Sequence, residues 1–171
     1  MNTGKIHFRQ ALAEDAQTIT DLINSAYRGD SARGGWTHEA DLVDGLRIDR
    51  EEFLSLIRSP KDFILLACEG SSILGCVHVR REERSLYFGM LSVSPGLQNS
   101  GIGAALLREV DARARNEGKC SVRLSVIHTR EELIAYYRRK GFSPTGHSDP
   151  FPEQYPARIP GLRLMEMQKT L

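Results

Sequence analysis

The sequence predicts an α/β (α+β) fold in which a mixed, mostly antiparallel sheet packs against helices. Three observations predict it. Some stretches alternate apolar and polar residues, as half-buried strands do, and others carry apolar residues three and four apart, as helices do. One strand-helix-strand run has the spacing of a β-α-β crossover, whose two strands are parallel. The expected order is β-α-α-β-β-β-α-β-α-β-β.

The first half of the chain predicts a strand, two helices and a hairpin. The segment KIHFRQA alternates like a strand, and residues 15–27 carry a helix stripe. Residues 29–49 are rich in glycine and charge and predict a loop with one short helix at most. Asp49 and Glu52 form a capping-box pattern that opens the second helix. Residues 63–79 predict two strands around a Gly-Ser turn.

The second half predicts the crossover, a further helix and the end of the sheet. The crossover consists of strand 85–93, helix 101–117 and strand 121–127. Thr129 and Glu132 form a capping-box pattern for the next helix, and Gly141 closes it. Five of the seven prolines lie between positions 144 and 160, which predicts a structured loop or lid before a last strand.

Composition and charge predict one globular domain spanning residues 1–171. The net charge of +1 argues against a nucleic-acid partner, because phosphate binding selects for a basic excess. No stretch approaches the roughly 20 apolar residues of a membrane span, and the N-terminus lacks the apolar segment of a signal peptide. Three cysteines without framework spacing favour a reducing compartment. We therefore expect a cytoplasmic protein without membrane contacts.

The stretch LQNSGIGAALL, residues 97–107, joins a strand to a helix through two closely spaced glycines. The stretch does not match a P-loop, because Ile102 stands where that motif requires a lysine. It does not match the Gly-x-Gly-x-x-Gly fingerprint of dinucleotide-binding proteins either, because Leu106 stands in the place of the third glycine. Two interpretations remain open on this turn alone. It is an anion site, formed by backbone N–H groups at a helix N-terminus and suited to a pyrophosphate, or a tight turn that needs glycine for its own geometry.

Together with a second motif, this turn resembles the GNAT superfamily of acyl-CoA-dependent N-acetyltransferases. LSVSPGLQNSGIGAALL is similar to the family signature, a strand ending in Leu-x-Val-x-Pro followed by Gln-x-x-Gly-x-Gly at a helix start. AYYRRKGF, residues 135–142, is similar to a second landmark, a tyrosine four residues before Gly-Phe. The motifs cover residues 86–142. The resemblance implies a GNAT fold whose central strands, 85–93 and 121–127, splay around the thioester.

The resemblance also implies a site for acetyl-CoA as cosubstrate, without a metal. The backbone of Leu91 and Val93 would pair with the pantetheine arm like an added strand. The Leu91 N–H would support the oxyanion, and Tyr137 would be the general acid, unless it only packs on its helix and anchors its hydroxyl. The pyrophosphate cradle would be Gln98, Asn99, Ser100, Gly101, Ile102, Gly103 and Ala104.

The general base is left open. Many family members place a glutamate on the strand before the signature, where this chain has LYFGML. An ordered water chain is one substitute, and the candidate side chains are Glu39, Asp41, Glu82, Glu83 and His128. Mid-strand Gly89 indicates a bulge, a close backbone approach or packing space.

We expect an N-acetyltransferase that moves an acetyl group from acetyl-CoA to a primary amine, of a small molecule, through a ternary complex. The missing strand glutamate keeps a second hypothesis open, a non-catalytic acyl-CoA-binding sensor module. A third, acetylation of protein N-termini or lysines, would require an open groove. The resemblance also leaves room for a homodimer.

The acceptor pocket is expected between the 29–49 loop and the proline-rich 144–160 loop, because variable loops carry specificity. Trp36 would cover an acceptor there or pin the loop to the body. The acidic residues Glu39, Asp41 and Asp44 would favour a cationic amine, although Arg33 and Arg47 in the same loop weaken that expectation.

Overall fold

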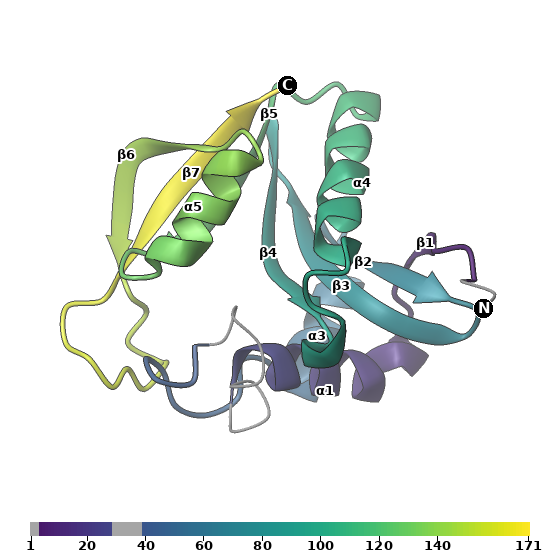
Figure 1. Cartoon of the computed structure of the whole chain (residues 1–171), viewed down its shortest axis with the longest axis horizontal. Coiled ribbons are helices and arrows are strands. Elements are labelled where there is room, and N and C mark those ends of the chain that lie inside the picture. The colour runs from purple at the N-terminus through teal and green to yellow at the C-terminus, as the bar shows by residue number, and fades with distance from the viewer. Residues whose placement is uncertain (1–3, 29–38) are drawn as a thin grey trace.

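The computed structural model describes residues 4–28 and 39–171, and Trp36 and Arg33 lie outside these ranges. Its seven strands form one sheet in the order β1-β2-β3-β4-β5-β7-β6 (Figure 1). The strands are β1 (His7–Gln10), β2 (Asp62–Glu69), β3 (Ser72–Arg81), β4 (Ser85–Val93), β5 (Ser121–Ile127), β6 (Ser143–Pro150) and β7 (Arg163–Thr170). The described α-helices are α1 (Ala16–Tyr27), α3 (Arg50–Arg58), α4 (Ile102–Asn116) and α5 (Glu131–Arg139). The predicted element order is confirmed.

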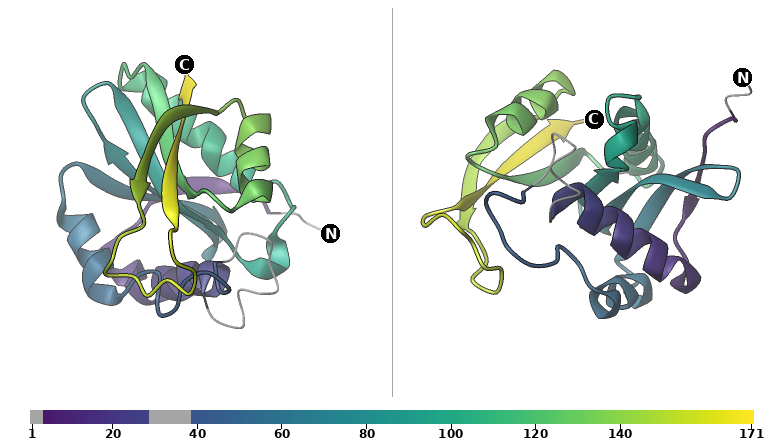
Figure 2. Two further views of the ribbon diagram at one scale, coloured as in Figure 1. Left: turned by 90° about the vertical axis from the view of Figure 1, so that its left-hand side faces the viewer. Right: turned by 60° about the horizontal axis from the view of Figure 1, so that its bottom comes forward.

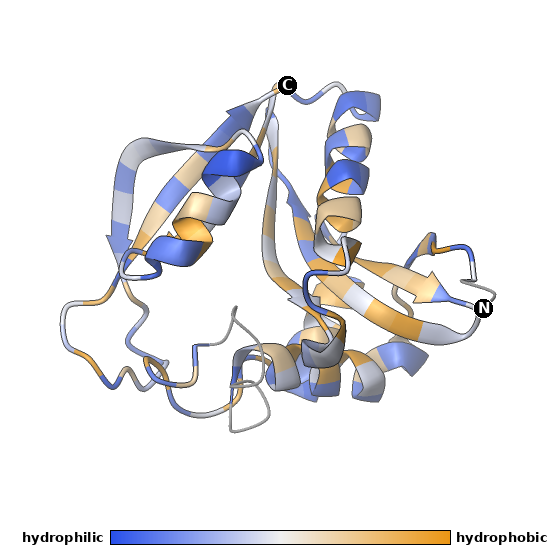
Figure 3. Ribbon diagram, in the orientation of Figure 1, coloured by the Kyte–Doolittle hydropathy of each residue, from blue (hydrophilic) through white to orange (hydrophobic). Residues whose placement is uncertain are grey.

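Helices cover both faces of the sheet, and strand β2 shows why. Phe63 and Leu65 pack in a core with residues of α4 and α5, whereas Ile64 and Leu66 pack in a second core with α1 and α3. Successive side chains of a strand point to opposite faces of the sheet. An unbroken apolar run therefore belongs to a strand that is buried on both faces. The separation of α4 from α1 is visible in Figure 2, and Figure 3 shows that the central strands are apolar and the edge strand β6 is polar.

The two central strands pair only at one end. β4 and β5 run parallel and pair from Ser85 to Tyr87 and from Ser121 to Arg123, with no pairs beyond. From there the two halves of the sheet diverge, as Figure 1 shows. The predicted crossover through α4 and the predicted splay of the central strands are both confirmed.

Strand β4 contains a bulge after the end that pairs with β5. One residue of β3, Val77, faces two residues of β4, Met90 and Leu91. Met90 has a φ of 51°, in the left-handed region where a side chain is disfavoured. The bulge therefore begins one residue after Gly89, and it takes Leu91 out of the regular ladder with β3.

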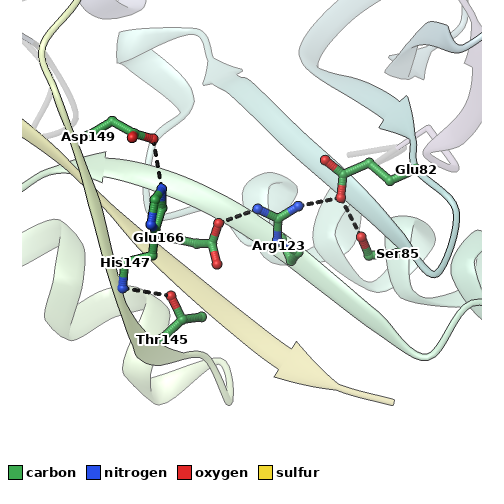
Figure 4. A network of polar contacts seen from close by, with 7 residues as sticks. All are labelled: Glu82, Ser85, Arg123, Thr145, His147, Asp149 and Glu166. Carbon is green, nitrogen blue, oxygen red and sulfur yellow. Dashed lines mark hydrogen bonds and ion pairs between the residues drawn. The ribbon is translucent and has the colours of Figure 1, made fainter.

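A polar cluster joins the strands where they begin to diverge (Figure 4). Arg123 on β5 forms ion pairs with Glu82, which precedes β4, and with Glu166 on β7. Ser85 donates a hydrogen bond to Glu82. Arg123 is opposite Tyr87, the last residue of β4 that pairs with β5. The cluster therefore joins three parts of the sheet at the apex of the divergence.

Two local predictions were wrong in detail. The α5 N-cap is Arg130 without a side-chain cap, rather than Thr129, so the capping box expected there does not form. The first part of the proline-rich span is the edge strand β6, which contains Pro144 and Pro150, and only the residues after it form a loop. Proline is tolerated in an edge strand because its missing N–H leaves no central ladder bond unmade. The Asp49–Glu52 capping box does form at α3.

Candidate functional site

A cavity of about 260 Å³ lies where β4 ends, between the start of α4 and helix α5. We call it the first cavity. Eight of the nine predicted coenzyme-binding residues line it, and Ser100 does not. The Ser100 side chain and N–H both donate to the Leu97 carbonyl within the turn. The remaining walls include Leu133, Tyr136 and Lys140 of α5 and its C-terminal end.

The two glycines of the turn have different physical roles. Gly101 has a φ of 86° and forms the left-handed N-cap of α4, which the turn itself requires. Gly103 lies inside the helix, where any residue fits the backbone. A Cβ there would meet the Tyr136 hydroxyl at 3.6 Å and a Val93 methyl at 3.8 Å, inside the first cavity. Gly103 therefore leaves space at the cavity wall, so each interpretation of the motif applies to one glycine.

Backbone donors converge on this cavity. The first helical hydrogen bond of α4 runs from the Ala105 N–H to the Gly101 carbonyl at 3.0 Å. The N–H groups of Ile102, Gly103 and Ala104 precede it and so have no partner within the helix. They carry the positive end of the helix dipole, which favours an anion. The arrangement fits a phosphate-bearing ligand.

A second cavity, of about 110 Å³, opens between the diverging strands. It is lined by Phe88 to Leu91 of β4 and Leu124 to Ile127 of β5, and by loop residues that include Phe151 and Tyr155. The first and second cavities share a wall made of Tyr27, Leu91, Leu133 and Tyr137. A group that passes from one cavity to the other must pass these side chains.

Tyr137 is held at that shared wall by other aromatic rings. Its ring centroid is 5.8 Å from those of Phe88 and Phe142 and 5.3 Å from that of Tyr136. Burial raises the pKa of Tyr137 well above its ordinary value, and the nearby charge of Arg130 only partly opposes the rise. The phenol is therefore protonated at neutral pH. The side chain both packs in the core and faces the two cavities, so the two roles weighed for it do not exclude each other.

Leu91 meets a partner that the sequence did not reveal. The Tyr27 hydroxyl, at the end of α1, donates a hydrogen bond to the Leu91 carbonyl at 2.8 Å. Tyr27 is buried, and its burial raises the pKa of its phenol. The contact joins residues 64 positions apart, and the sequence marked Tyr27 only as the last residue of the predicted helix. The hydrogen bond fixes the bulged backbone at the shared wall.

The candidate bases separate clearly in the structure. Glu39 lines the second cavity, and its Oε2 accepts hydrogen bonds from the Arg28 guanidinium at 3.0 and 3.3 Å. Glu82 belongs to the Arg123 cluster, and the His128 Nδ1 accepts from the Arg163 N–H at 3.1 Å. Glu39 is thus the one of these three that lines either cavity.

The expectation that acidic residues favour a cationic amine is not supported. Arg28 neutralises Glu39, and Arg158 forms an ion pair with Asp44 at 2.7 Å. Within residues 4–28 and 39–171, no group of three or more His, Cys, Asp or Glu side chains is placed to hold a metal ion. In the same ranges, no helix has both the length and the apolar character needed to cross a membrane.

The comparisons with known proteins agree with this geometry. A family model described as acetyltransferase (GNAT) family matches residues 17–142. An uncharacterized N-acetyltransferase of Mycobacterium tuberculosis is 28% identical over 110 residues, which cover 64% of this chain and 70% of the relative.

Two solved structures share the fold at 20% identity. The ribosomal-protein-alanine N-acetyltransferase from Brucella melitensis superposes with a TM-score of 0.69. The superposition covers 96% of this chain and 99% of the Brucella chain. The structure of yncA from Salmonella typhimurium with its cofactor acetyl-CoA has a TM-score of 0.70, with 98% and 94% covered. With the family match over residues 17–142, the chain belongs to the GNAT family of acetyltransferases and is an acyltransferase.

Proposed function

We propose that this chain, acting as a single domain, transfers an acetyl group from acetyl-CoA to the primary amine of a small molecule within a ternary complex. One observation carries the proposal: the first and second cavities meet at a wall that contains both Leu91 and Tyr137. Two sites that open onto one wall suit direct transfer between two bound substrates. The yncA structure with acetyl-CoA supports the choice of coenzyme.

The first cavity suits the coenzyme. The free N–H groups at the start of α4 would bind the pyrophosphate, together with Gln98 and Asn99. The end of β4, at Leu91 and Val93, would pair with the pantetheine arm, because the bulge removes Leu91 from the ladder with β3. In this arrangement the thioester would lie at the shared wall.

The transfer step needs few side chains. The amine nitrogen attacks the thioester carbonyl carbon, the C–N bond forms, and the C–S bond breaks. The Leu91 N–H is proposed to support the oxyanion, and the Tyr137 hydroxyl to give its proton to the leaving thiolate. Glu39 is the candidate acceptor for the amine proton, because it lines the second cavity. Both hydrogen bonds from the Arg28 guanidinium go to Oε2 of Glu39, so Arg28 does not occupy Oε1.

Loop closure over the second cavity favours a small acceptor over a protein chain. Val43 and Ala157 form a β-bridge, the Asp44 N–H donates to the Pro156 carbonyl at 2.9 Å, and the Arg158 N–H donates to the Leu42 carbonyl at 2.8 Å. These contacts join the segment after residue 38 to the loop after β6. A protein N-terminus or lysine would need an open groove at this position.

The function is tested by following free-thiol release from acetyl-CoA with a panel of amines and identifying products by mass. We expect amine-dependent release and an acetylated product, and calorimetric binding of CoA without any amine. CoA binding without turnover of any amine would favour the sensor module instead. An absence of CoA binding would contradict the assignment of the first cavity.

A further inference from the structure

The charges that line the second cavity are unbalanced. Its described lining contains three arginines, Arg28, Arg47 and Arg130, and one carboxylate, Glu39. Three positive charges and one negative charge leave an excess of two positive charges. A cavity of this sign disfavours an acceptor that presents only cationic amines, because like charges repel at short range.

One arginine is accounted for within the protein. The Arg28 side chain is 3% exposed, and its Nε and Nη2 both donate to Oε2 of Glu39, while Nη1 donates to the Asp44 carbonyl at 3.2 Å. A charge buried this deeply must be paired. Arg28 and Glu39 therefore form a neutral unit, which leaves Arg47 to be considered as a binding group for a ligand.

Arg47 is the arginine best placed to bind a ligand. Its side chain is half-buried, and its guanidinium carbon lies 6.0 Å from the centroid of the Tyr27 ring. The same tyrosine donates its hydroxyl to the Leu91 carbonyl. One tyrosine side chain thus spans the distance between the Arg47 guanidinium and the proposed transfer point. At this distance the ring attracts the guanidinium as a cation. The planar guanidinium can bind a carboxylate through two parallel hydrogen bonds.

We propose that the acceptor is a small amino-carboxylate, with its amine at the Leu91–Tyr137 wall and its carboxylate on Arg47. The cavity of about 110 Å³ limits the acceptor to a compact molecule. This inference rests on the proposed acetyl transfer and adds the acceptor's second functional group to it.

The test compares acceptors that differ only in the carboxylate. Each proteinogenic amino acid, and β-alanine, is assayed beside its carboxamide and its decarboxylated amine, with rates corrected for the fraction of neutral amine. For the wild-type chain we expect kcat/KM to be about 10- to 100-fold higher for the carboxylate, as one charge-assisted pair provides. The matched aminoalkyl phosphonates are included to separate a carboxylate site from a general anion site.

Variants assign the effect to Arg47. In Arg47→Ala we expect the KM of the carboxylate acceptor to rise about 10- to 100-fold, with the carboxamide little changed. Arg47→Lys should restore part of the preference. The control is Arg50→Ala, an exposed residue at the start of α3 that does not line either cavity. It should keep the full preference.

The outcomes separate this inference from the function beneath it. If no amine accelerates thiol release, both are wrong. If amines are acetylated but carboxamides, decarboxylated amines or phosphonates serve as well as carboxylates, only the carboxylate inference is wrong. The same holds if Arg47→Ala keeps the wild-type preference.

Discussion

At the scale of single residues, Tyr137 combines two properties that a general acid needs. Three aromatic rings hold its position, and burial keeps its hydroxyl protonated. It also lines both cavities. The same packing that makes it a core residue therefore presents its proton at the one wall where the proposed leaving group would need it.

Replacing Tyr137 with phenylalanine should lower kcat and leave the affinity for acetyl-CoA unchanged. The ring packing is retained, and only the proton donor is lost. A thiol with a pKa near that of cysteine, about 8.5, is a tolerable leaving group without help. We therefore expect a loss of about 10- to 100-fold, less than the roughly 10²–10⁴-fold typical of general acid catalysis. Steady-state kinetics and calorimetry measure the two quantities, and an unchanged kcat would remove Tyr137 from the mechanism.

The same residue predicts the pH profile. Because burial raises the pKa of Tyr137 well above 10, its proton is present throughout the range in which the amine loses its own. The rate should rise with pH as neutral amine accumulates and should show no Tyr137-dependent decline below about pH 10. A descending limb near neutral pH that disappears in Tyr137→Phe would contradict this.

Gly103 offers a test of the first cavity. In Gly103→Val the added atoms would enter the space between Tyr136 and Val93, beside the N–H groups proposed to bind the pyrophosphate. Losing one charge-assisted hydrogen bond should weaken CoA binding about 10-fold or more, with thermal stability nearly retained. The control is Gly96→Val, because a Cβ at Gly96 meets nothing within 4 Å and the residue does not line the cavity. Equal CoA affinity in both variants would show that the pyrophosphate lies elsewhere.

At the scale of elements, the divergence of β4 and β5 makes the site and the Arg123 cluster limits it. Parallel pairing stops at Tyr87 and Arg123, where the Arg123 guanidinium contacts both Glu82 and Glu166. A sheet that opens on one side loses ladder hydrogen bonds there. The ion pairs at the apex join the two halves at the last point where the backbone still pairs.

Replacing Arg123 with methionine should destabilise the fold more than it affects the site. The Glu166 side chain is 15% exposed, so it would lose its partner in a poorly solvated position, at a cost of about 1–3 kcal/mol. CoA affinity should stay within about twofold, since the cluster lies outside both cavities. Arg113→Met, which breaks an i,i+4 pair with Glu109 at 3.5 Å, should cost less. Denaturant unfolding measures the difference, and equal costs would contradict a special role for the apex.

The stability lost in Arg123→Met should depend on pH. Burial, the largest single effect, would raise the pKa of Glu166. The hydrogen bonds from Arg123 and Thr145 and the charges of Arg123 and His147 together outweigh burial, so the net pKa is lowered from 4.5. A carboxyl with a lowered pKa stabilises the fold above its unfolded pKa, and this stability is lost as pH falls through the folded pKa. The gap between the wild type and Arg123→Met should therefore shrink below about pH 4. A gap that is constant into acid would indicate a packing effect.

At the scale of the whole molecule, distant segments close the second cavity. Val43 is buried with Ile127 and Leu162, and it forms the bridge to Ala157. The proposed acceptor side is thus built from the segment before α3, the end of strand β5 and the segment that leads into β7. The segment before α3 and the loop after β6 approach each other in Figure 1. The coenzyme side depends on the short β4–α4 connection and α5.

Separating these segments should affect the acceptor and spare the coenzyme. In Val43→Asp a charge would replace an apolar side chain that is 1% exposed, which is unfavourable without a partner. We expect the loops to part, the KM of the acceptor to rise by about 10-fold or more, and CoA affinity to remain. Proteolysis of the loop after β6 would report the opening. Unchanged acceptor KM with an opened loop would mean that the loops do not shape the acceptor site.

Much of the fold, and most residues that line the first cavity, could be predicted from the sequence. Strand 85–93 and strand 121–127 have the predicted bounds, because alternation and glycine boundaries are local signals. The turn at Gly101 was recognisable for the same reason. The Thr129 cap was predicted wrongly, since a capping pattern shows only which hydrogen bond is available and not whether the chain adopts it.

Local patterns predicted the order of elements, the β-α-β crossover and the glycine turn, since each depends on neighbours a few residues apart. The splay of the central strands was expected only from the resemblance to the GNAT family. Three features became visible only in the folded structure: the bulge begins at Met90, the Tyr27 hydroxyl donates a hydrogen bond to the Leu91 carbonyl, and Arg28 neutralises Glu39. The charge of the second cavity follows from these long-range contacts. Side chains distant in sequence meet only when the whole sheet has folded, so no local pattern could encode which of them are paired.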